Sequence, residues 1–351
     1  MDEWSMHLRA DLLPWLLEES NPSVRYYTLT DLLGLPEDDV QVAASHKQIM
    51  ESGYVPALLE VMQREAYRNR YPYFYTDKYK GLVWSLLTLA EHGCELTAQV
   101  KAQCEYMFEH AQEPIDGGFS MHASARQGGG RMTEVIPCLT GNMAWALIKF
   151  GYQEDARLQK ALDWLVRFSR FNDGEEQEGV PSPYDRYEMC WGKHTCLMAT
   201  VKMLKAFAEI PAGMRSPEIQ ATMDRGIAFL LAHHIYKRSH ARMKVSKPGW
   251  LHFGYPLMYQ TDILEILDIL TTLGIKDARM DEAIEVVVSK QDEEGRWRLE
   301  NTYGSERLLI PIGEKGQQSK WLTLRALRVL KRYGASEGSN RVPDTALKYL
   351  R

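Results

Sequence analysis

Metal binding is the first chemistry that the sequence suggests, through Cys138, Cys190, His194 and Cys196. Zinc prefers four Cys or His ligands in a tetrahedron, and these side chains would supply them. The last three cannot share one helical face, because positions i and i+4 align whereas i+6 does not, so a loop-to-helix transition near residue 190 is required. The alternative is that the cysteines are small buried side chains that only pack.

Proton transfer is the second chemistry, and its candidates are His194, Asp262 and Tyr79. Asp262 precedes an apolar stretch, so it would act as a general acid with a raised pKa if it faced an apolar cavity. The alternative is an acid that stabilises the N-terminus of a helix. Glu265 and Asp268 follow within the same apolar stretch and require either partners or a polar cavity.

A repeat positions these residues. An apolar helical stretch that ends at a glycine or at a Pro/Gly break occurs six times, about every sixty residues. The breaks lie at Gly34, Gly93, Gly151, the region around Pro211, Gly274 and Gly334. Glycine ends a helix readily in the left-handed conformation. A fixed period of this size indicates an array of supersecondary units.

Each apolar stretch is followed by a more charged helix, expected over 37–52, 97–111, 155–169, 216–236 and 277–290, with Asp155 and Asp277 as N-caps. The first helices are apolar on most sides, which is typical of buried helices. We therefore predict an all-α fold, an (α/α)6 toroid of six helical hairpins with an inner and an outer ring. No linker interrupts the repeat, so residues 1–351 are expected to form one domain, with 5–19 or 343–350 completing the outer ring.

In such a ring the inner helices run in the same direction, so their N-termini meet at one mouth. Superposing the repeats places Tyr79, Cys138, His194, Asp262 and Lys320 around this rim. The ligand-binding residues are expected to be Trp84, Asn142, Trp145, Tyr255 and Lys320. Long loops rich in Tyr, Trp, His and Arg precede the inner helices, and loops of this length usually carry function.

Basic clusters accompany these loops. His233 begins one that extends to Arg242, Arg64 begins another that extends to Arg70, and Arg296 and Arg298 flank Trp297. Arg and Lys side chains of this kind could hold a diphosphate or a carboxylate. The alternative is a solvated, salt-bridged surface.

Composition narrows the classes of protein. The net charge of −5 argues against a nucleic-acid-binding surface. No apolar run of about 18 residues occurs, so no transmembrane segment is expected. The N-terminus is acidic and amphipathic, unlike a signal peptide. The five cysteines are an odd number and suggest reduced thiols, so we expect a cytoplasmic protein.

Two motifs carry a resemblance to a known family. Gln291-Asp-Glu-Glu-Gly295-Arg-Trp297 is similar to the Q-x3-G-x-W repeat of squalene and oxidosqualene cyclases, and Gln112-Glu-Pro-Ile-Asp-Gly117-Gly-Phe119 to its prenyltransferase variant. The chain thus resembles the prenyltransferase and squalene-cyclase repeat superfamily, as a single-domain terpenoid cyclase-like α/α toroid. In these motifs Gly would make the tight turn, the aromatic ring would pack into the helix layer, and Gln would bond backbone.

The resemblance also bears on the site. Protein prenyltransferase β-subunits bind zinc with Asp, Cys and His, and Lys193-His194-Thr195-Cys196 resembles their Y-H-T-C-like stretch. Cys138 lies roughly where the family has its D-x-C motif, but Ile136 stands in place of the Asp. The acidic D-x-D-D cluster of cyclases that protonate an alkene is absent from the sequence.

Three functions remain open. The first is a terpenoid cyclase/prenyltransferase-like lyase, isomerase or transferase that holds an apolar or prenyl-like ligand in the central cavity, with zinc as its metal if one assists. The second is a hydrolase or lyase on a sugar or small acid, and the third a non-catalytic binding or scaffold protein. An aromatic cavity would favour the first, a polar cavity the second, and a cavity plugged by residues 120–133 the third.

Overall fold

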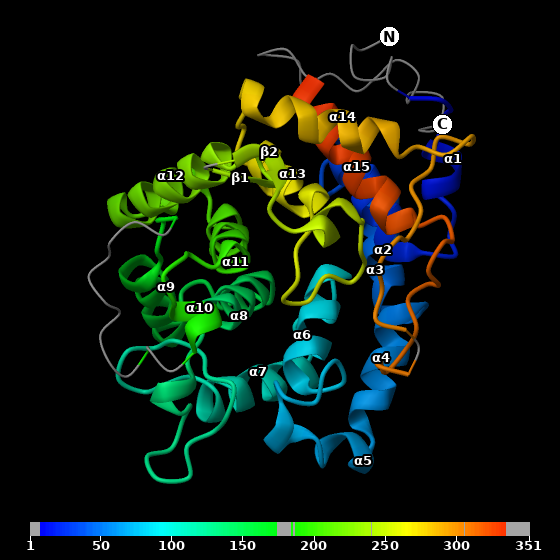
Figure 1. Ribbon diagram of the computed structural model, residues 1–351. Helices are drawn as coiled ribbons and strands as arrows, with labels where there is room; N and C mark the ends of the chain where they lie inside the picture. Colours follow the sequence, from blue (N-terminus) through cyan, green and yellow to red (C-terminus); the bar gives the residue numbers. More distant parts are fainter. Residues whose placement is uncertain (1–7, 174–183, 185–186, 240, 305, 335–351) are drawn as a thin grey trace.

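Helices make up most of the chain in a computed structural model that describes residues 8–173, 184, 187–239, 241–304 and 306–334 (Figure 1). Six helical segments coincide with the predicted apolar stretches: α2 (Pro22–Tyr27) with its π-helical continuation η2 (Thr28–Leu32), α6 (Leu82–Glu91), α8 (Pro137–Lys149), α11 (Leu197–Ala208), α13 (Ile263–Thr272) and α15 (Lys320–Gly334). The prediction of a mainly helical chain is confirmed.

The charged helices follow as predicted. They are α3 (Val40–Glu51), α7 (Ala98–His110), α9 (Ala156–Phe168), α12 (Pro217–Ala232) and α14 (Asp281–Ser289). Asp155 caps α9 by accepting a hydrogen bond from the Arg157 amide at 2.8 Å, as its position predicts. Asp277 instead caps η8 (Ala278–Met280), a 3₁₀ turn that leads into α14.

The remaining elements are short or unexpected. They are α1 (Leu13–Leu16), α4 (Tyr54–Gln63), α5 (Glu65–Arg68), α10 (Glu188–Trp191), the 3₁₀ turns η3 (Tyr71–Tyr73), η4 (Met132–Glu134), η6 (Ala212–Met214) and η7 (Pro248–Leu251), and an antiparallel pair of strands, β1 (Lys237–Arg238) and β2 (Ala241–Val245), with Lys237 opposite Val245. Within 5–19 only α1 is a helix among the described residues, so no long outer helix forms there. Residues 343–350 lie outside the described part of the chain.

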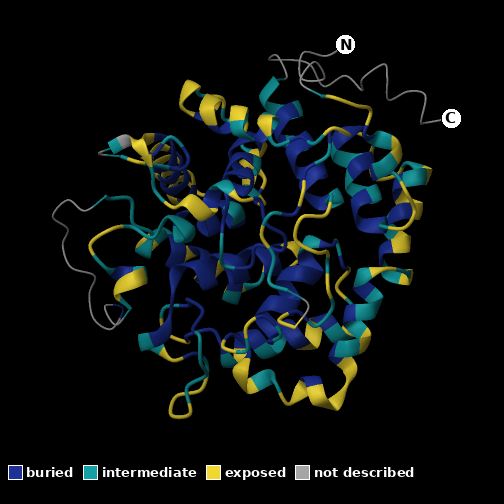
Figure 2. Cartoon of the chain, turned by 45° about the vertical axis from the view of Figure 1, so that its right-hand side comes forward, coloured by how far each residue is buried: buried dark blue, intermediate teal, exposed yellow. Residues whose placement is uncertain are grey.

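Burial separates the two groups of helices. In α8 every residue from Pro137 to Ile148 is buried, whereas α9 buries one face, at Leu158, Ala161, Leu162, Trp164 and Leu165. Figure 2 shows the buried segments in the middle of the molecule and the exposed ones around it. A helix that is apolar on all sides is stable only when neighbours surround it, so the expected division into buried and surface helices holds.

The buried helices contact one another in chain order. Packed pairs are α6 with α8, α8 with α11, α11 with α13, and α13 with α15, and α15 packs on α2 and η2. The Ser23 hydroxyl of α2 donates to the His92 carbonyl at the end of α6, at 2.7 Å, so the sequence of contacts returns to its start. Gly141 lets α8 approach α11, because a Cβ at this position would lie 2.7 Å from the Lys202 carbonyl carbon.

The two sequence motifs have the same structural role. Trp297 and Phe119 are fully buried, and the amide of each donates to a threonine hydroxyl of the next buried helix, Thr323 at 3.1 Å and Thr140 at 2.9 Å. The Gln112 amide donates to the Arg157 carbonyl of α9 at 2.7 Å. Gly117 and Gly295 have φ values of 91° and 77°, as the tight turns require. The motifs therefore join neighbouring helical pairs.

Candidate functional site

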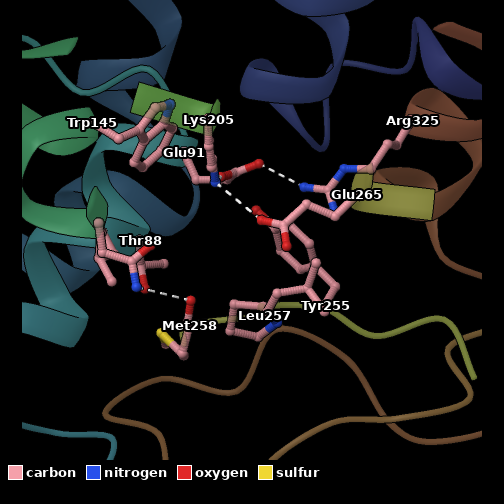
Figure 3. A pocket seen from close by; sticks show the side chains of 12 residues that line it. Thr88, Glu91, Trp145, Lys205, Tyr255, Leu257, Met258, Glu265 and Arg325 are labelled. Atoms are coloured by element: carbon pink, nitrogen blue, oxygen red, sulfur yellow. Dashed lines mark hydrogen bonds and ion pairs between the residues drawn. The ribbon is translucent and has the colours of Figure 1, made fainter. Parts of the chain in front are cut away.

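Four charged side chains from four different helices meet in the middle of the molecule. Glu91 of α6 accepts hydrogen bonds from Lys205 of α11 at 3.0 Å and from Arg325 of α15 at 2.7 Å. Glu265 of α13 lies 3.7 Å from the same Lys205 amine. Figure 3 shows these side chains pointing toward a common centre. We call Glu91, Lys205, Glu265 and Arg325 the central charge cluster.

Burial makes this cluster energetically important. Glu265 also accepts two hydrogen bonds, both 2.7 Å, from Lys202, whose side chain is 1% exposed. Burial alone would raise the pKa of Glu265, but the charges of Lys202, Lys205 and Arg325 outweigh it and hold the pKa below its usual value. The same balance, with Lys205 and Arg325 as the cations, lowers the pKa of Glu91. Both carboxyls are therefore ionised at neutral pH, and neither is a ready proton donor.

A small cavity lies beside the central charge cluster. Its volume is about 20 Å³, and Asn142, Trp145 and Tyr255 are among the residues that line it. Two buried polar atoms, the Tyr255 hydroxyl and Nη1 of Arg325, have no hydrogen-bond partner among the described residues. A cavity needs about 10–15 Å³ to hold a water molecule, so this one has room for about one.

Residues 255–258 close this cavity on one side. Pro256, Leu257 and Met258 form part of its lining. The Asn142 amide donates to the Met258 carbonyl at 3.2 Å, and the Tyr303 hydroxyl to the Leu257 carbonyl at 2.8 Å. Residues 120–133, whose closure of the cavity would have favoured a non-catalytic protein, contribute no residue to this lining.

A larger cavity lies at the other side of the cluster, at the C-terminal ends of the buried helices. It has a volume of about 240 Å³ and shares Glu91, Trp145 and Lys205 with the small cavity. Its further charged residues are Asp31, Lys149, Glu209, Asp268, Arg328 and Arg332. We call this cavity the C-terminal cup.

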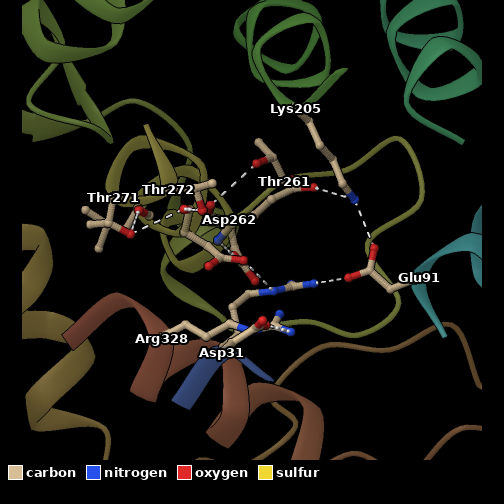
Figure 4. A network of polar contacts seen from close by, with 12 residues as sticks. Asp31, Glu91, Lys205, Thr261, Asp262, Thr271, Thr272 and Arg328 are labelled. Atoms are coloured by element: carbon tan, nitrogen blue, oxygen red, sulfur yellow. Dashed lines mark hydrogen bonds and ion pairs between the residues drawn. The ribbon is translucent and has the colours of Figure 1, made fainter. Parts of the chain in front are cut away.

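The charges of the cup are paired across helices. Asp268 of α13 accepts from Arg332 of α15 at 2.8 Å, and Arg328 lies 2.5 Å from Asp31 of η2. Figure 4 shows Asp31 and Arg328 at one side of this network and Glu91 with Lys205 at the other. The Arg328 Nε atom is buried and has no partner among the described residues. The cup therefore combines paired charges with one donor that lacks an acceptor.

Asp262 is the N-cap of α13. Its two carboxyl oxygens accept hydrogen bonds from the amides of Glu265 and Gly254, both at 2.8 Å. Burial raises the pKa of Asp262 to about 6, although Arg325 counteracts it. The raised pKa fits the predicted general acid, whereas the two backbone bonds fit the alternative of a helix-capping acid.

Tyr79 and Trp84 belong to an aromatic cluster that is separate from the small cavity. The Tyr79 ring lies 3.8 Å from that of Tyr303, 5.2 Å from Trp84 and 6.2 Å from Tyr259. The Trp84 indole donates to the Tyr75 carbonyl at 3.0 Å, so its polar atom is occupied. Burial raises the pKa of Tyr79, which disfavours its tyrosinate form.

The predicted metal ligands have different surroundings. Burial, followed by the neighbouring thiols of Cys196 and Cys190, raises the pKa of Cys138. The His194 side chain is 66% exposed, and its Nδ1 atom lies 3.5 Å from the carboxylate of Asp173. Within the described ranges no three His, Cys, Asp or Glu residues form a group that could hold a metal ion. Zinc therefore stays a prediction without a formed ligand set.

The residues that were expected to lie together around one rim thus have different neighbours in the structure. Asn142, Trp145 and Tyr255 line the small cavity, whereas Lys320 donates to Glu18 at 2.7 Å and does not line it, so ligand binding by these four residues stays a prediction. Sequence reasoning missed Glu91, Lys205 and Arg325 as site residues. The sequence feature that could have identified them is a charged residue inside an apolar helical stretch.

Comparisons with known proteins give limited information. The sequence matches no family model and no curated protein. Among solved structures, the type II terpene cyclase MstE from Scytonema matches in its apo form at 16% identity and with bound geranylgeranyl dihydroxybenzoate at 14% identity. In both cases the TM-score is 0.41, over 90% of this chain and 87% of that one. In the described part of this chain, no helix is both long and apolar enough to cross a membrane.

Proposed function

We propose that the helical pairs form an (α/α)6 toroid, as one domain, and that its charged centre binds a small anionic molecule. The closed order of contacts from α6 through α15 to α2 supports the toroid. In such a toroid the central charge cluster would lie inside the ring and the C-terminal cup at one of its mouths. The ligand would enter through the cup, because residues 255–258 line the other side.

The observation that carries the proposal is the excess of buried donors. Arg325 Nη1 and Arg328 Nε have no acceptor among the described residues, and the Tyr255 hydroxyl has no partner there either. A buried polar group without a partner costs about 1–3 kcal/mol. In the C-terminal cup, an oxygen-rich anion such as a carboxylate or a phosphate would satisfy Arg328 Nε with a charge-assisted bond, whereas Arg325 and Tyr255 line the small cavity.

The volumes favour a small and polar ligand over an apolar one. Ligand sites usually measure about 300–1,000 Å³. The cup, at about 240 Å³, approaches this range, whereas the small cavity, at about 20 Å³, holds no prenyl chain. An apolar ligand at the centre would also desolvate the paired charges without bonding to them, which is costly.

A terpenoid cyclase-like activity is the second candidate, because one observation favours it. Asp262, whose pKa burial raises to about 6, lies at the start of a buried helix, as a proton-donating acid would. Aromatic rings such as Tyr79 and Trp84 could stabilise positive charge through their faces. This activity would require residues 255–258 to move so that the small cavity joins a larger space.

Calorimetric titration with citrate tests the first candidate. We expect saturable binding that weakens about tenfold in Arg332→Gln, since one charge-assisted bond contributes about 1.5–3 kcal/mol. Lys101→Gln, on the exposed face of α7, is the matched control and should bind as the wild type does. Absence of binding at millimolar citrate, or equal loss in the control, would refute the proposal. Conversion of a geranylgeranyl-bearing substrate that is abolished by Asp262→Asn would support the second candidate instead.

A further inference from the structure

One cavity of the described chain is separate from the centre. It is a groove of about 630 Å³ that no role assigned above uses. His252 and Phe253, which follow η7, line it together with residues 297–301 and with Lys315 and Gly316. Lys290 contributes from the end of α14. Its volume lies within the range of about 300–1,000 Å³ that is usual for small-molecule sites.

Backbone hydrogen bonds hold the walls of this groove in place. The Glu300 amide donates to the Phe253 carbonyl at 3.0 Å, and the Gly316 amide to the Leu299 carbonyl at 2.7 Å. Phe253 and Leu299 are at most 3% exposed, so they anchor the lining in the apolar core. The groove is therefore built on connected segments and does not depend on one loose loop.

The side chains at the groove carry an excess of positive charge. Lys290, Arg298 and Lys315 are its cations, and Glu300 is its acid. Both oxygens of Glu300 are already occupied, by the Lys290 amine at 2.5 Å and by the Phe253 amide at 2.8 Å. Lys290 is thus paired inside the groove and Arg298 with Asp292 at its edge, so among the groove cations only Lys315 has no ion pair with a described residue. A positive cleft with apolar walls concentrates its field on anions.

Arg298 and Lys315 lie where they can reach a ligand. The Arg298 side chain is 53% exposed, donates to the Gly316 carbonyl at 3.2 Å and lies 3.1 Å from Asp292. Five N–H groups are available on a guanidinium, so donors remain for an anion. Lys315 is exposed and makes no ion pair with a residue in the described ranges.

We propose that this groove binds an organic phosphate, a molecule with a phosphate for Arg298 and Lys315 and a flat or apolar body. The site shares no lining residue with the small cavity or the C-terminal cup, so it stands apart from the proposed function. Guanidinium and ammonium groups recognise phosphate through charge-assisted hydrogen bonds. The body would lie on the apolar part of the groove's lining.

Calorimetry with naphthyl phosphate as the probe tests the proposal. We expect saturable binding that is about tenfold or more weaker in Arg298→Gln and in Lys315→Gln, and that weakens as the salt concentration rises. Inorganic phosphate lacks the apolar body and naphthol lacks the phosphate, so each should bind at least about tenfold more weakly than naphthyl phosphate. Lys315 is exposed, so Lys315→Gln leaves the packing unchanged and still tests the proposal if Arg298→Gln folds poorly.

Two controls separate this site from the centre. Lys101→Gln removes an equivalent exposed charge elsewhere, and Arg332→Gln removes a cup residue; both should leave the affinity for naphthyl phosphate unchanged. The proposal is overturned if both groove variants bind the probe as the wild type does. It is overturned equally if Arg332→Gln alone abolishes binding, since the probe would then occupy the cup.

Discussion

Removing Arg325 should destabilise the protein more than removing any exposed cation. Its side chain is 6% exposed and it faces Glu91 at 2.7 Å and Asp268 at 3.7 Å. Breaking a buried ion pair by deleting one partner costs about 3–5 kcal/mol, because the other charge stays buried without compensation. An exposed pair is worth at most about 1 kcal/mol. We therefore expect Arg325→Met to lose about 3–5 kcal/mol of the free energy of unfolding at pH 7.

Urea denaturation followed by circular dichroism measures this loss. The matched control is Arg279→Met, which breaks the pair of Arg279 with Asp277, where the arginine side chain is 44% exposed. The control should lose less than about 1 kcal/mol. In a double-mutant cycle, Glu91→Gln combined with Arg325→Met should cost about 0.5–3 kcal/mol less than the sum of the two single variants, because the groups are in contact.

Two results would contradict this reasoning. A loss in Arg325→Met no larger than that in Arg279→Met would mean that Arg325 is not buried against two carboxylates. Strict additivity of Glu91→Gln and Arg325→Met would mean that these side chains do not interact. Either outcome would remove the central charge cluster as a structural unit, and with it the basis for an anion site at the centre.

Three further predictions concern other parts of the molecule. Burial raises the pKa of Asp262 to about 6, above an unfolded value near 3.9, so the native state keeps this proton at a higher pH than the unfolded state does; the stability of the wild type relative to Asp262→Asn should therefore fall by up to about 3 kcal/mol as the pH rises from about 4 to 6, which urea denaturation of both proteins measures. Gly141→Ala should lose about 1–3 kcal/mol of the free energy of unfolding, because its methyl group would meet the α11 backbone at 2.7 Å. Gly213→Ala, with no atom within 4 Å of the added methyl group, should change it by less than about 0.5 kcal/mol. Equal melting curves for the two variants would contradict the close approach of α8 and α11. If zinc is bound through Cys138, elemental analysis of protein purified without chelator should find about one zinc per chain that is lost in Cys138→Ser, and protein that binds no zinc and whose thiols all react freely would end the zinc proposal.

Local signals explain why the helices could be predicted. The stretch expected to precede Gly151 is α8, Pro137–Lys149, and the helix expected over 155–169 is α9, Ala156–Phe168. Helical periodicity, the N-cap Asp155 and the left-handed Gly151, with φ of 83°, are all readable over a few residues. Helix α4 was missed because it lies inside the first repeat, between the charged helix and Gly93. The other described repeats have no such helix at the equivalent position.

The site was harder to predict because its residues pair across the fold. Glu91 ends α6 next to a glycine break, a place where a charged residue is ordinarily solvated, and nothing local indicates that Lys205 and Arg325 lie beside it. The burial of Asn142 and Trp145 could be predicted because they belong to a helix that is apolar on all sides. The exposure of His194 could not, because it depends on how the chain enters α11.

Stability alone gives no reason for the charges at the centre. A buried ion pair can usually be replaced by apolar side chains of similar volume without loss of stability, so a chain under selection for folding alone would have no need of Glu91 and Arg325 in this position. The pairs do join helices that are distant in sequence, α6 with α11 and α15, and this could fix which helices are neighbours. Fixing neighbours does not account for the unpartnered Arg325 Nη1, Arg328 Nε and Tyr255 hydroxyl, since each such group costs about 1–3 kcal/mol. An anion that accepts from Arg328 Nε would remove part of this cost, which gives the charges at the centre a role besides folding.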